Sequence, residues 1–152
     1  MQIGAVAGND GGSECMRAVK LLVLWCIGGM LYILCELVFR GHSHWTMFIV
    51  GGICFLCIGA INEIIPWDMP IWQQAIIGAI IVTSIEFVSG CILNIWLEWN
   101  IWDYSDMPFN ILGQICLPFT AIWLIISVIA IILDDYLRYW MFDEEKPFYK
   151  LM

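Results

Sequence analysis

The chain has 152 residues, of which 62% are hydrophobic and 13% charged, and its formal net charge is −8. Soluble domains are about 45–50% apolar and about 25% charged, so this composition indicates a membrane protein of one domain. The negative charge argues against nucleic-acid binding and against attachment to anionic lipid through a polybasic surface.

Four apolar stretches follow one another along the chain. A segment that crosses lipid must satisfy its own backbone hydrogen bonds, as an α-helix or in a closed barrel, and long unbroken apolar runs favour helices. We therefore predict an all-α, polytopic membrane protein whose transmembrane domain covers residues 18–140. A flexible tail is expected over residues 1–17 and a C-terminal tail over residues 141–152. The predicted spans are residues 18–39, 46–65, 71–96 and 111–133.

The first predicted span, residues 18–39, carries an acid near its end. Glu36 precedes Arg40 by one helical turn, which is the favourable order for an ion pair. An acid at this position costs less than one at the bilayer centre. The following connector holds His42 and His44, which we interpret as interfacial residues because a metal site needs further ligands.

The second predicted span, residues 46–65, is rich in glycine, which allows close approach of another helix. Pro66 and Pro70 end it and set a tight turn before the next span. Cys54 and Cys57 have a spacing also found in redox and metal sites. No second pair accompanies them, so we interpret them as small apolar packing residues and predict no metal site.

The third predicted span, residues 71–96, holds Glu86 near its middle and Asn94 near its end. A carboxylate near the bilayer midplane costs about 2.5–3.5 kcal/mol on insertion scales, so Glu86 needs a partner, a bound proton or a polar cavity. The small and polar positions recur every three or four residues and share one helix face. They are Ala75, Ala79, Thr83, Glu86, Gly90 and Asn94.

The connector over residues 97–110 contains three acids, two tryptophans and a tyrosine. This composition predicts an interfacial loop or a short re-entrant segment. Pro108 breaks any helix here, and Asn110 is expected to cap the fourth span. Pro118 is expected to kink that span, which also carries Thr120 on a polar face.

The distribution of basic residues predicts the orientation in the cell membrane. With four spans, both termini and the middle connector lie on one side, and that side holds five of the six Lys and Arg residues. The positive-inside rule therefore predicts that both termini are cytoplasmic. The five residues are Arg17, Lys20, Arg138, Lys146 and Lys150, and Arg40 lies on the other side.

The two halves of the chain share a pattern that indicates a duplication. In each half a Glu-bearing helix is followed by a polar connector and by a helix that opens with glycine. Two such helical hairpins of equal topology would be related by an axis along the membrane normal.

Residues 102–119 read W-D-Y-S-D-M-P-F-N-I-L-G-Q-I-C-L-P-F. This run resembles a bacterial family of small membrane proteins called ABC-transporter type IV permeases, or CmpB-like proteins, and the resemblance extends over about residues 31–149. It implies a permease-like membrane component. The residues that match the motif are Trp102, Asp103, Tyr104, Ser105, Pro108, Asn110, Gly113 and Gln114.

The first functional hypothesis is that of a transporter subunit. The chain has no G-x-x-x-x-G-K-[ST] loop, so an ATP-binding subunit would be a separate chain. Four helices are too few to enclose a substrate path, so transport would require an oligomer in the lipid bilayer, either a homo-oligomer or an assembly with that ATP-binding subunit. The residues expected to line the path are Glu36, Glu86, Asn94, Thr83 and Thr120.

The second hypothesis is a structural or regulatory membrane protein that moves no substrate. Glu86 would then hydrogen-bond to Asn94, to Gln114 or to a tryptophan N–H and fix the helix register. Residues 102–110 would form a packed cap.

The third hypothesis is a membrane enzyme that acts on lipid. No H-E-x-x-H, G-x-S-x-G or comparable nucleophile motif is present in the sequence. We therefore expect no enzymatic activity and no cofactor.

Overall fold

The structure is a computed structural model that describes residues 10–66 and 68–151. Its helices are α1 (Asp10–Arg40), α2 (Trp45–Ile64), α3 (Ile71–Gly90) and α4 (Leu117–Phe142). A π-helical turn, η1 (Cys91–Trp96), continues α3, and a two-stranded antiparallel hairpin, β1 (Asn110–Ile111) with β2 (Ile115–Cys116), precedes α4. In the described part of the chain, four helical stretches are long and apolar enough to cross a membrane, which confirms the predicted all-α architecture.

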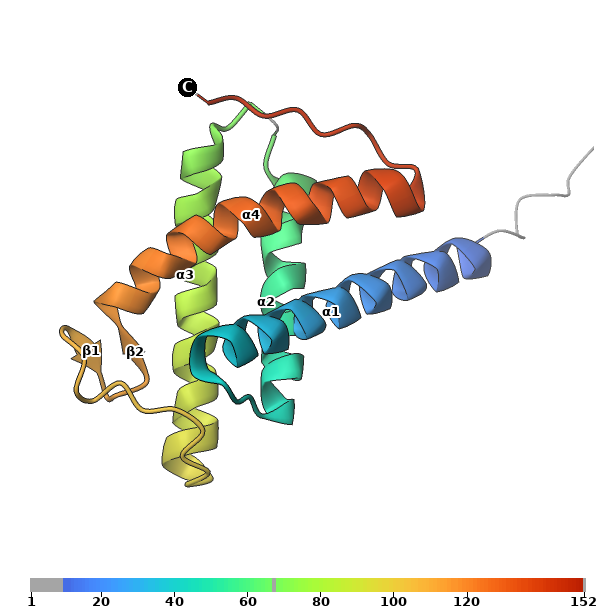
Figure 1. Cartoon of the computed structure of the whole chain (residues 1–152). Helices are drawn as coiled ribbons and strands as arrows, with labels where there is room; N and C mark the ends of the chain where they lie inside the picture. The colour runs from blue at the N-terminus through green and yellow to red at the C-terminus, as the bar shows by residue number, and fades with distance from the viewer. Residues whose placement is uncertain (1–9, 67, 152) are drawn as a thin grey trace, which may run out of the picture.

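The four long helices form two hairpins, α1–α2 and α3–α4. Figure 1 shows α2 and α3 side by side, with α1 and α4 crossing them obliquely. We call the end with residues 41–44 and 97–116 the loop end, and the end with residues 65–70 and 143–151 the tail end. That the hairpins arose by duplication stays a prediction.

Helix α1 begins at Asp10, within the predicted tail and well before the predicted start of the span at residue 18. Extending a helix that has already formed is easier than starting one, because each added residue gains one hydrogen bond. The α-helix can therefore continue beyond the apolar residues that cross the membrane. Residues 1–9 of the predicted tail lie outside the described residues, and the division into tail and domain otherwise stays a prediction.

Two glycines of α2 allow α1 to pack closely. A Cβ atom on Gly51 would lie 2.3 Å from Cβ of Tyr32, and one on Gly52 would lie 2.6 Å from the Trp25 ring. Both distances are too short for real atoms, so only glycine fits. Gly51 therefore lets Tyr32 lie directly against α2, and the Tyr32 ring stacks on Trp123 of α4 with ring centroids 5.8 Å apart.

The fourth helix differs from the prediction of a span over residues 111–133. Residues 110–116 form the small hairpin, because Gly113 adopts a positive φ of +69° that turns the chain. Asn110 is therefore not the N-cap, and α4 begins at Leu117. Pro118 lies in the first turn, where backbone N–H groups have no helical acceptor, so it removes no bond and the predicted kink has no cause.

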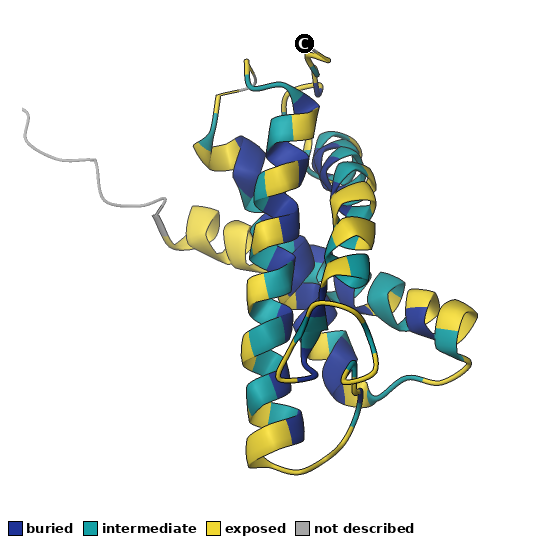
Figure 2. Ribbon diagram, turned by 90° about the vertical axis from the view of Figure 1, so that its left-hand side faces the viewer, coloured by how far each residue is buried: buried dark blue, intermediate teal, exposed yellow. Residues whose placement is uncertain are grey.

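The core lies between the hairpins and is dominated by α2. Buried and exposed residues alternate along the helices, so that each helix has a buried and an exposed face (Figure 2). Many exposed side chains are large and apolar, including those of Ile80, Ile125 and Ile129, as expected for surfaces that contact lipid. The core cluster comprises Met47, Val50, Cys54, Ile58, Ile61, Ile71, Val82, Trp102 and Ile131.

Candidate functional site at the loop end

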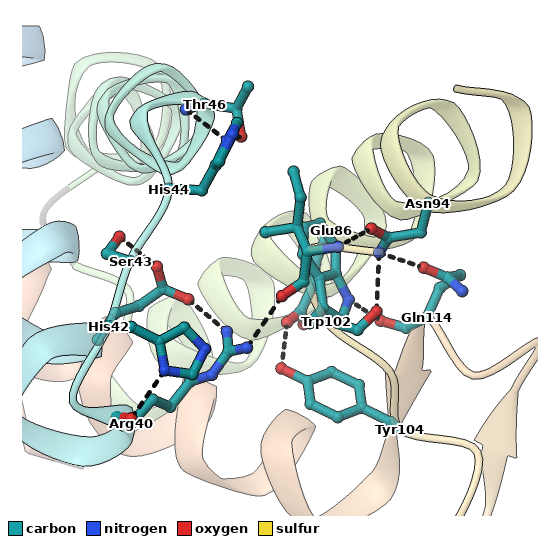
Figure 3. A network of polar contacts seen from close by, with 12 residues as sticks. Arg40, His42, Ser43, His44, Thr46, Glu86, Asn94, Trp102, Tyr104 and Gln114 are labelled. Atoms are coloured by element: carbon teal, nitrogen blue, oxygen red, sulfur yellow. Dashed lines mark hydrogen bonds and ion pairs between the residues drawn. The ribbon is translucent and has the colours of Figure 1, made fainter. Parts of the chain in front are cut away.

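Glu36 lies at the loop end of α1, where a positively charged side chain and a hydroxyl group donate hydrogen bonds to its carboxylate. Its Oε1 accepts a hydrogen bond from Nη1 of Arg40 at 2.7 Å, and its Oε2 accepts one from Oγ of Ser43 at 2.6 Å. The same Arg40 donates through Nη2 to the carbonyl oxygen of Ile101 at 3.0 Å (Figure 3). The predicted i,i+4 ion pair is therefore present. The second hydrogen bond of its Arg40 joins α1 to the connector that follows α3.

Glu86 lies in α3 with only 4% of its surface exposed, and its partners are uncharged. Its Oε2 accepts from Nε1 of Trp123 at 2.8 Å, and its Oε1 accepts from the hydroxyl of Tyr104 at 3.2 Å. None of the ion pairs among the described residues includes Glu86. A tryptophan N–H is one of the partners that the structural hypothesis expected for Glu86. The Tyr104 hydroxyl is a second partner that the sequence analysis did not predict.

Tyr104 reaches Glu86 from the connector. Burial raises the pKa of Tyr104 above its usual range, and the charge of Glu86 and the hydrogen bond to it raise the pKa further. The phenol therefore stays protonated and acts as the donor. Its ring stacks on Phe119 of α4 with centroids 4.6 Å apart, which holds the hydroxyl in place.

Asn94 fixes the connector to the end of α3. Its Nδ2 donates to the carbonyl oxygen of Trp102 at 3.0 Å and to Oε1 of Gln114 at 2.8 Å, and its Oδ1 accepts from the backbone N–H of Ile101 at 2.7 Å. Trp102 Nε1 in turn donates to the carbonyl oxygen of Gln114 at 3.0 Å. Asn94 belongs to the π-helical turn η1, a local geometry frequent at functional sites.

The motif loop between Asp103 and Gly113 is held by short-range hydrogen bonds. Asp103 Oδ1 accepts from the backbone N–H of Ser105 at 2.8 Å and from its hydroxyl at 2.5 Å, and these two bonds lower the pKa of Asp103. Asn110 donates to the carbonyl oxygens of Ser105 at 3.0 Å and Met107 at 2.9 Å. Asn110 therefore stabilises a tight loop instead of capping a helix. Pro108 is exposed within it.

The predicted path residues are brought together only in part. Glu86 and Asn94 bind the connector between α3 and α4 directly, whereas Glu36 is linked to it through Arg40. Thr83 and Thr120 bond to each other at 3.4 Å and join α3 to α4. The role of all five in a substrate path stays a prediction.

The comparison with family models matches residues 21–146 to a family described as "Putative ABC-transporter type IV". The chain belongs to this family. The match covers most of α1, all later elements and the whole loop-end site. The protein is thus a multi-pass membrane protein of an ABC-transporter-related family. No match was found among curated proteins or among solved structures.

A second polar cluster of this family member lies at the tail end, where sequence reasoning expected only the end of a span. Nε of Arg138 donates to Oδ2 of Asp134 at 2.5 Å, and both side chains are buried. Oδ2 of Asp135 accepts from Nδ2 of Asn62 at 2.6 Å and from the Tyr149 hydroxyl at 2.8 Å. The hydrogen bond from Tyr149 ties the C-terminal segment to α4.

An acidic cleft of about 410 Å³ opens beside this cluster. Two sequence signals could have revealed the cluster: the i,i+4 spacing of Asp134 and Arg138, and Asn62 followed by Glu63 at the end of α2. The residues that line the cleft are Asn62, Glu63, Asp135, Arg138, Asp143, Glu144 and Glu145.

The two histidines of the first connector have different contacts. Nδ1 of His42 lies 3.0 Å from the Arg40 carbonyl oxygen, whereas His44 accepts from the backbone N–H of Thr46 and caps α2. The His44 ring lies 5.7 Å from that of Trp99. Among the described residues, no group of three or more His, Cys, Asp or Glu side chains is arranged to hold a metal ion.

Proposed function

We propose that the protein is a permease-like subunit of a transporter in the cell membrane, with no enzymatic activity of its own. Its energy would come from a separate ATP-binding subunit, which agrees with the family description. One observation carries the proposal: Glu86 is a buried carboxylate of a spanning helix whose hydrogen-bond donors in the described chain are both uncharged. Ionisable residues inside membrane segments are rare and usually belong to substrate, ion or proton paths.

Glu86 differs in this respect from Glu36. The ion pair with Arg40 balances the charge of Glu36, so taking up a proton there would break a charged interaction. Glu86 gains no such balance from Tyr104 and Trp123, so a proton or a cation can compensate its charge instead. We assign the coupling role to Glu86 and the positioning of the connector to Glu36.

The contact with Tyr104 links the charge of Glu86 to the connector. A protonated carboxyl group keeps one good acceptor oxygen and becomes a donor at the other. The hydrogen bonds with Tyr104 and Trp123 would then lose the contribution of the negative charge and become weaker. Protonation of Glu86 would therefore weaken the hold on the connector at the loop end, where a transported ion or solute would enter or leave.

The orientation completes the proposal. Both termini and the tail end would face the cytoplasm, since five of the six Lys and Arg residues lie on that side. The ATP-binding subunit would bind there, and the loop end would face outward.

Proton movement through reconstituted liposomes tests the proposal. The protein, purified from its own membranes together with its ATP-binding subunit, is placed in liposomes that hold a pH-sensitive dye and ATP, and a potassium diffusion potential drives proton entry. We expect flux with the wild type, loss of flux with Glu86→Gln, and unchanged flux with Glu98→Gln. Glu98 is an exposed connector acid, so the same chemical change there serves as the matched control. Equal flux in wild type and Glu86→Gln, or wild-type flux no greater than in empty liposomes, would overturn the proposal.

A structural or regulatory role is the second candidate, and one observation favours it. Both oxygens of Glu86 and the side chain of Asn94 find hydrogen-bond partners within the chain. In this case Glu86→Gln would lower the melting temperature in detergent while the wild type shows no flux. The two readouts together separate the candidates.

A further inference from the structure

We infer that the connector between α3 and α4 is re-entrant and that the β1–β2 hairpin inserts its apolar tip into lipid at the loop end. By the tip we mean three exposed apolar residues: Phe109, which precedes β1, Ile111 of β1, and Leu112, which opens the turn. The next two residues of the turn, Gly113 and Gln114, are buried against the rest of the chain. This inference does not depend on transport, because it concerns where the connector lies.

The connector turns back along α3 after leaving it. Gln114 of the connector packs against Gly90, where an added Cβ would lie 2.6 Å from its Oε1, and Tyr104 reaches Glu86. Gly90 and Glu86 precede Trp96, the end of η1, by six and ten residues. The α-helical rise of about 1.5 Å per residue is an upper value for the π-helical residues of η1, so these positions lie at most about 9 and about 15 Å back along the helix. Figure 1 shows the hairpin beside α3, above its lower end.

Several backbone groups at the turn of the hairpin have partners within the chain, which lowers the cost of placing this segment in lipid. Unpaired backbone groups are costly in hydrocarbon, so irregular loops at membrane depth must have their own partners. Oδ1 of Asn110 accepts from the N–H of Gly113 at 3.2 Å, and Nε2 of Gln114 donates to the Leu112 carbonyl oxygen at 3.0 Å. The Gly113 carbonyl oxygen accepts from the N–H of Tyr104 at 2.7 Å.

The tip turns large apolar side chains outward. Phe109 is 81% exposed, Leu112 66% and Ile111 54%. Phe109 and Leu112 have φ of 54° and 53°, a region that residues with a Cβ rarely adopt and that is frequent at functional sites. Exposed apolar residues in such a loop need a specific environment, because water would disfavour them.

Lipid is the occupant that the surroundings favour. Leu117, which follows Leu112 by five residues and begins α4, is exposed as well, and the outward face of α4 is apolar. The tip thus extends a surface that already contacts lipid. On the same connector the acids Asp103 and Asp106 are exposed, so this segment has a polar and an apolar part, as interfacial elements have.

Photo-crosslinking in liposomes tests the inference. Phe109 is replaced by p-benzoylphenylalanine in full-length protein, which is reconstituted in phosphatidylethanolamine and phosphatidylglycerol vesicles and illuminated. The same replacement at Leu112 is the second probe, and that at Asp106 is the matched control. Intact-protein mass spectrometry then measures the lipid adducts. We expect several-fold more adduct at positions 109 and 112 than at position 106.

Two results would overturn the inference. One is a lipid adduct at positions 109 and 112 that does not exceed the adduct at position 106, which would place the tip in water. The other is a covalent dimer as the main product at positions 109 and 112, which would assign the tip to a second copy of the chain. Size-exclusion profiles matching the wild type establish that each variant is folded.

Discussion

Two acids of the spanning helices, Glu36 and Glu86, meet the cost of burial in different ways. Glu36 has a charged partner in Arg40, and Glu86 has two neutral donors. Sequence spacing alone predicted the first pair, because Glu36 and Arg40 are one turn apart. The partners of Glu86 come from residues 18 and 37 positions away, so they depend on the fold.

Trp123→Phe tests the bond to Glu86. The phenyl ring retains much of the packing but lacks the N–H donor, so one oxygen of a buried carboxyl group loses its partner. We expect a loss of about 1–3 kcal/mol in unfolding free energy, measured in mild detergent. Trp96→Phe, at an exposed tryptophan, is the control and is expected to change little.

A double change provides a further check on this bond. Since Trp123→Phe and Glu86→Gln act on the same interaction, their combined cost should differ from the sum of the single costs. Strict additivity would show that Trp123 does not stabilise the protein through Glu86.

Arg138→Met tests the buried ion pair at the tail end. The change leaves Asp134 buried without its charged partner, and breaking such a pair costs about 3–5 kcal/mol. Lys150→Met, which removes the exposed ion pair with Asp68, is the matched control and should change the melting temperature little. Equal effects of the two variants would contradict the structural importance of the tail-end cluster.

At the level of elements, hydropathy predicted the four spans because each helix has a long apolar core. It predicted their ends less well. Ile111, Leu112 and Ile115 are apolar and look like helix, but the positive φ of Gly113 turns the chain into a hairpin. At the other end of α4, Asp134 and Asp135 looked like the end of a span. Instead, Asp135 has partners on α2 and in the C-terminal segment, and Asp134 pairs with Arg138 one turn later in the same helix.

Two tyrosines hold irregular segments onto the helices, and they predict a pH dependence. Burial is the largest cause that raises the pKa of Tyr104 in the connector and of Tyr149 in the C-terminal segment, followed by Glu86 and Asp135 respectively. The pKa of each tyrosine is thus higher in the folded than in the unfolded protein. Each hydroxyl therefore contributes its full share of the folding stability below about pH 10, and this share is lost as the pH rises through the folded-state pKa.

We therefore expect the melting temperature to fall more steeply with alkaline pH in the wild type than in the double variant Tyr104→Phe with Tyr149→Phe. The measurement is thermal unfolding in detergent at a series of pH values above neutrality, with tyrosinate absorbance as a second readout. Parallel curves for the two proteins would contradict the assignment of these hydroxyls as buried donors.

At the level of the whole molecule, the chain has one polar cluster at each end of a four-helix unit. The loop-end cluster joins α1, α3, α4 and the connector, and the tail-end cluster joins α2, α4 and the C-terminal segment. This arrangement fits the proposed subunit, in which a proton or cation would act on Glu86 at the loop end and the ATP-binding subunit would bind at the tail end. A four-helix unit is also too small to surround a solute path, so transport requires further subunits.

Native mass spectrometry of the assembly purified from its own membranes in mild detergent tests the central claim most directly. A permease-like subunit predicts more than one copy of the 17.4 kDa chain, bound to a subunit whose sequence contains a phosphate-binding G-x-x-x-x-G-K-[ST] loop. A monomer of 17.4 kDa without any partner would contradict the transporter role and leave Glu86 as a packing residue.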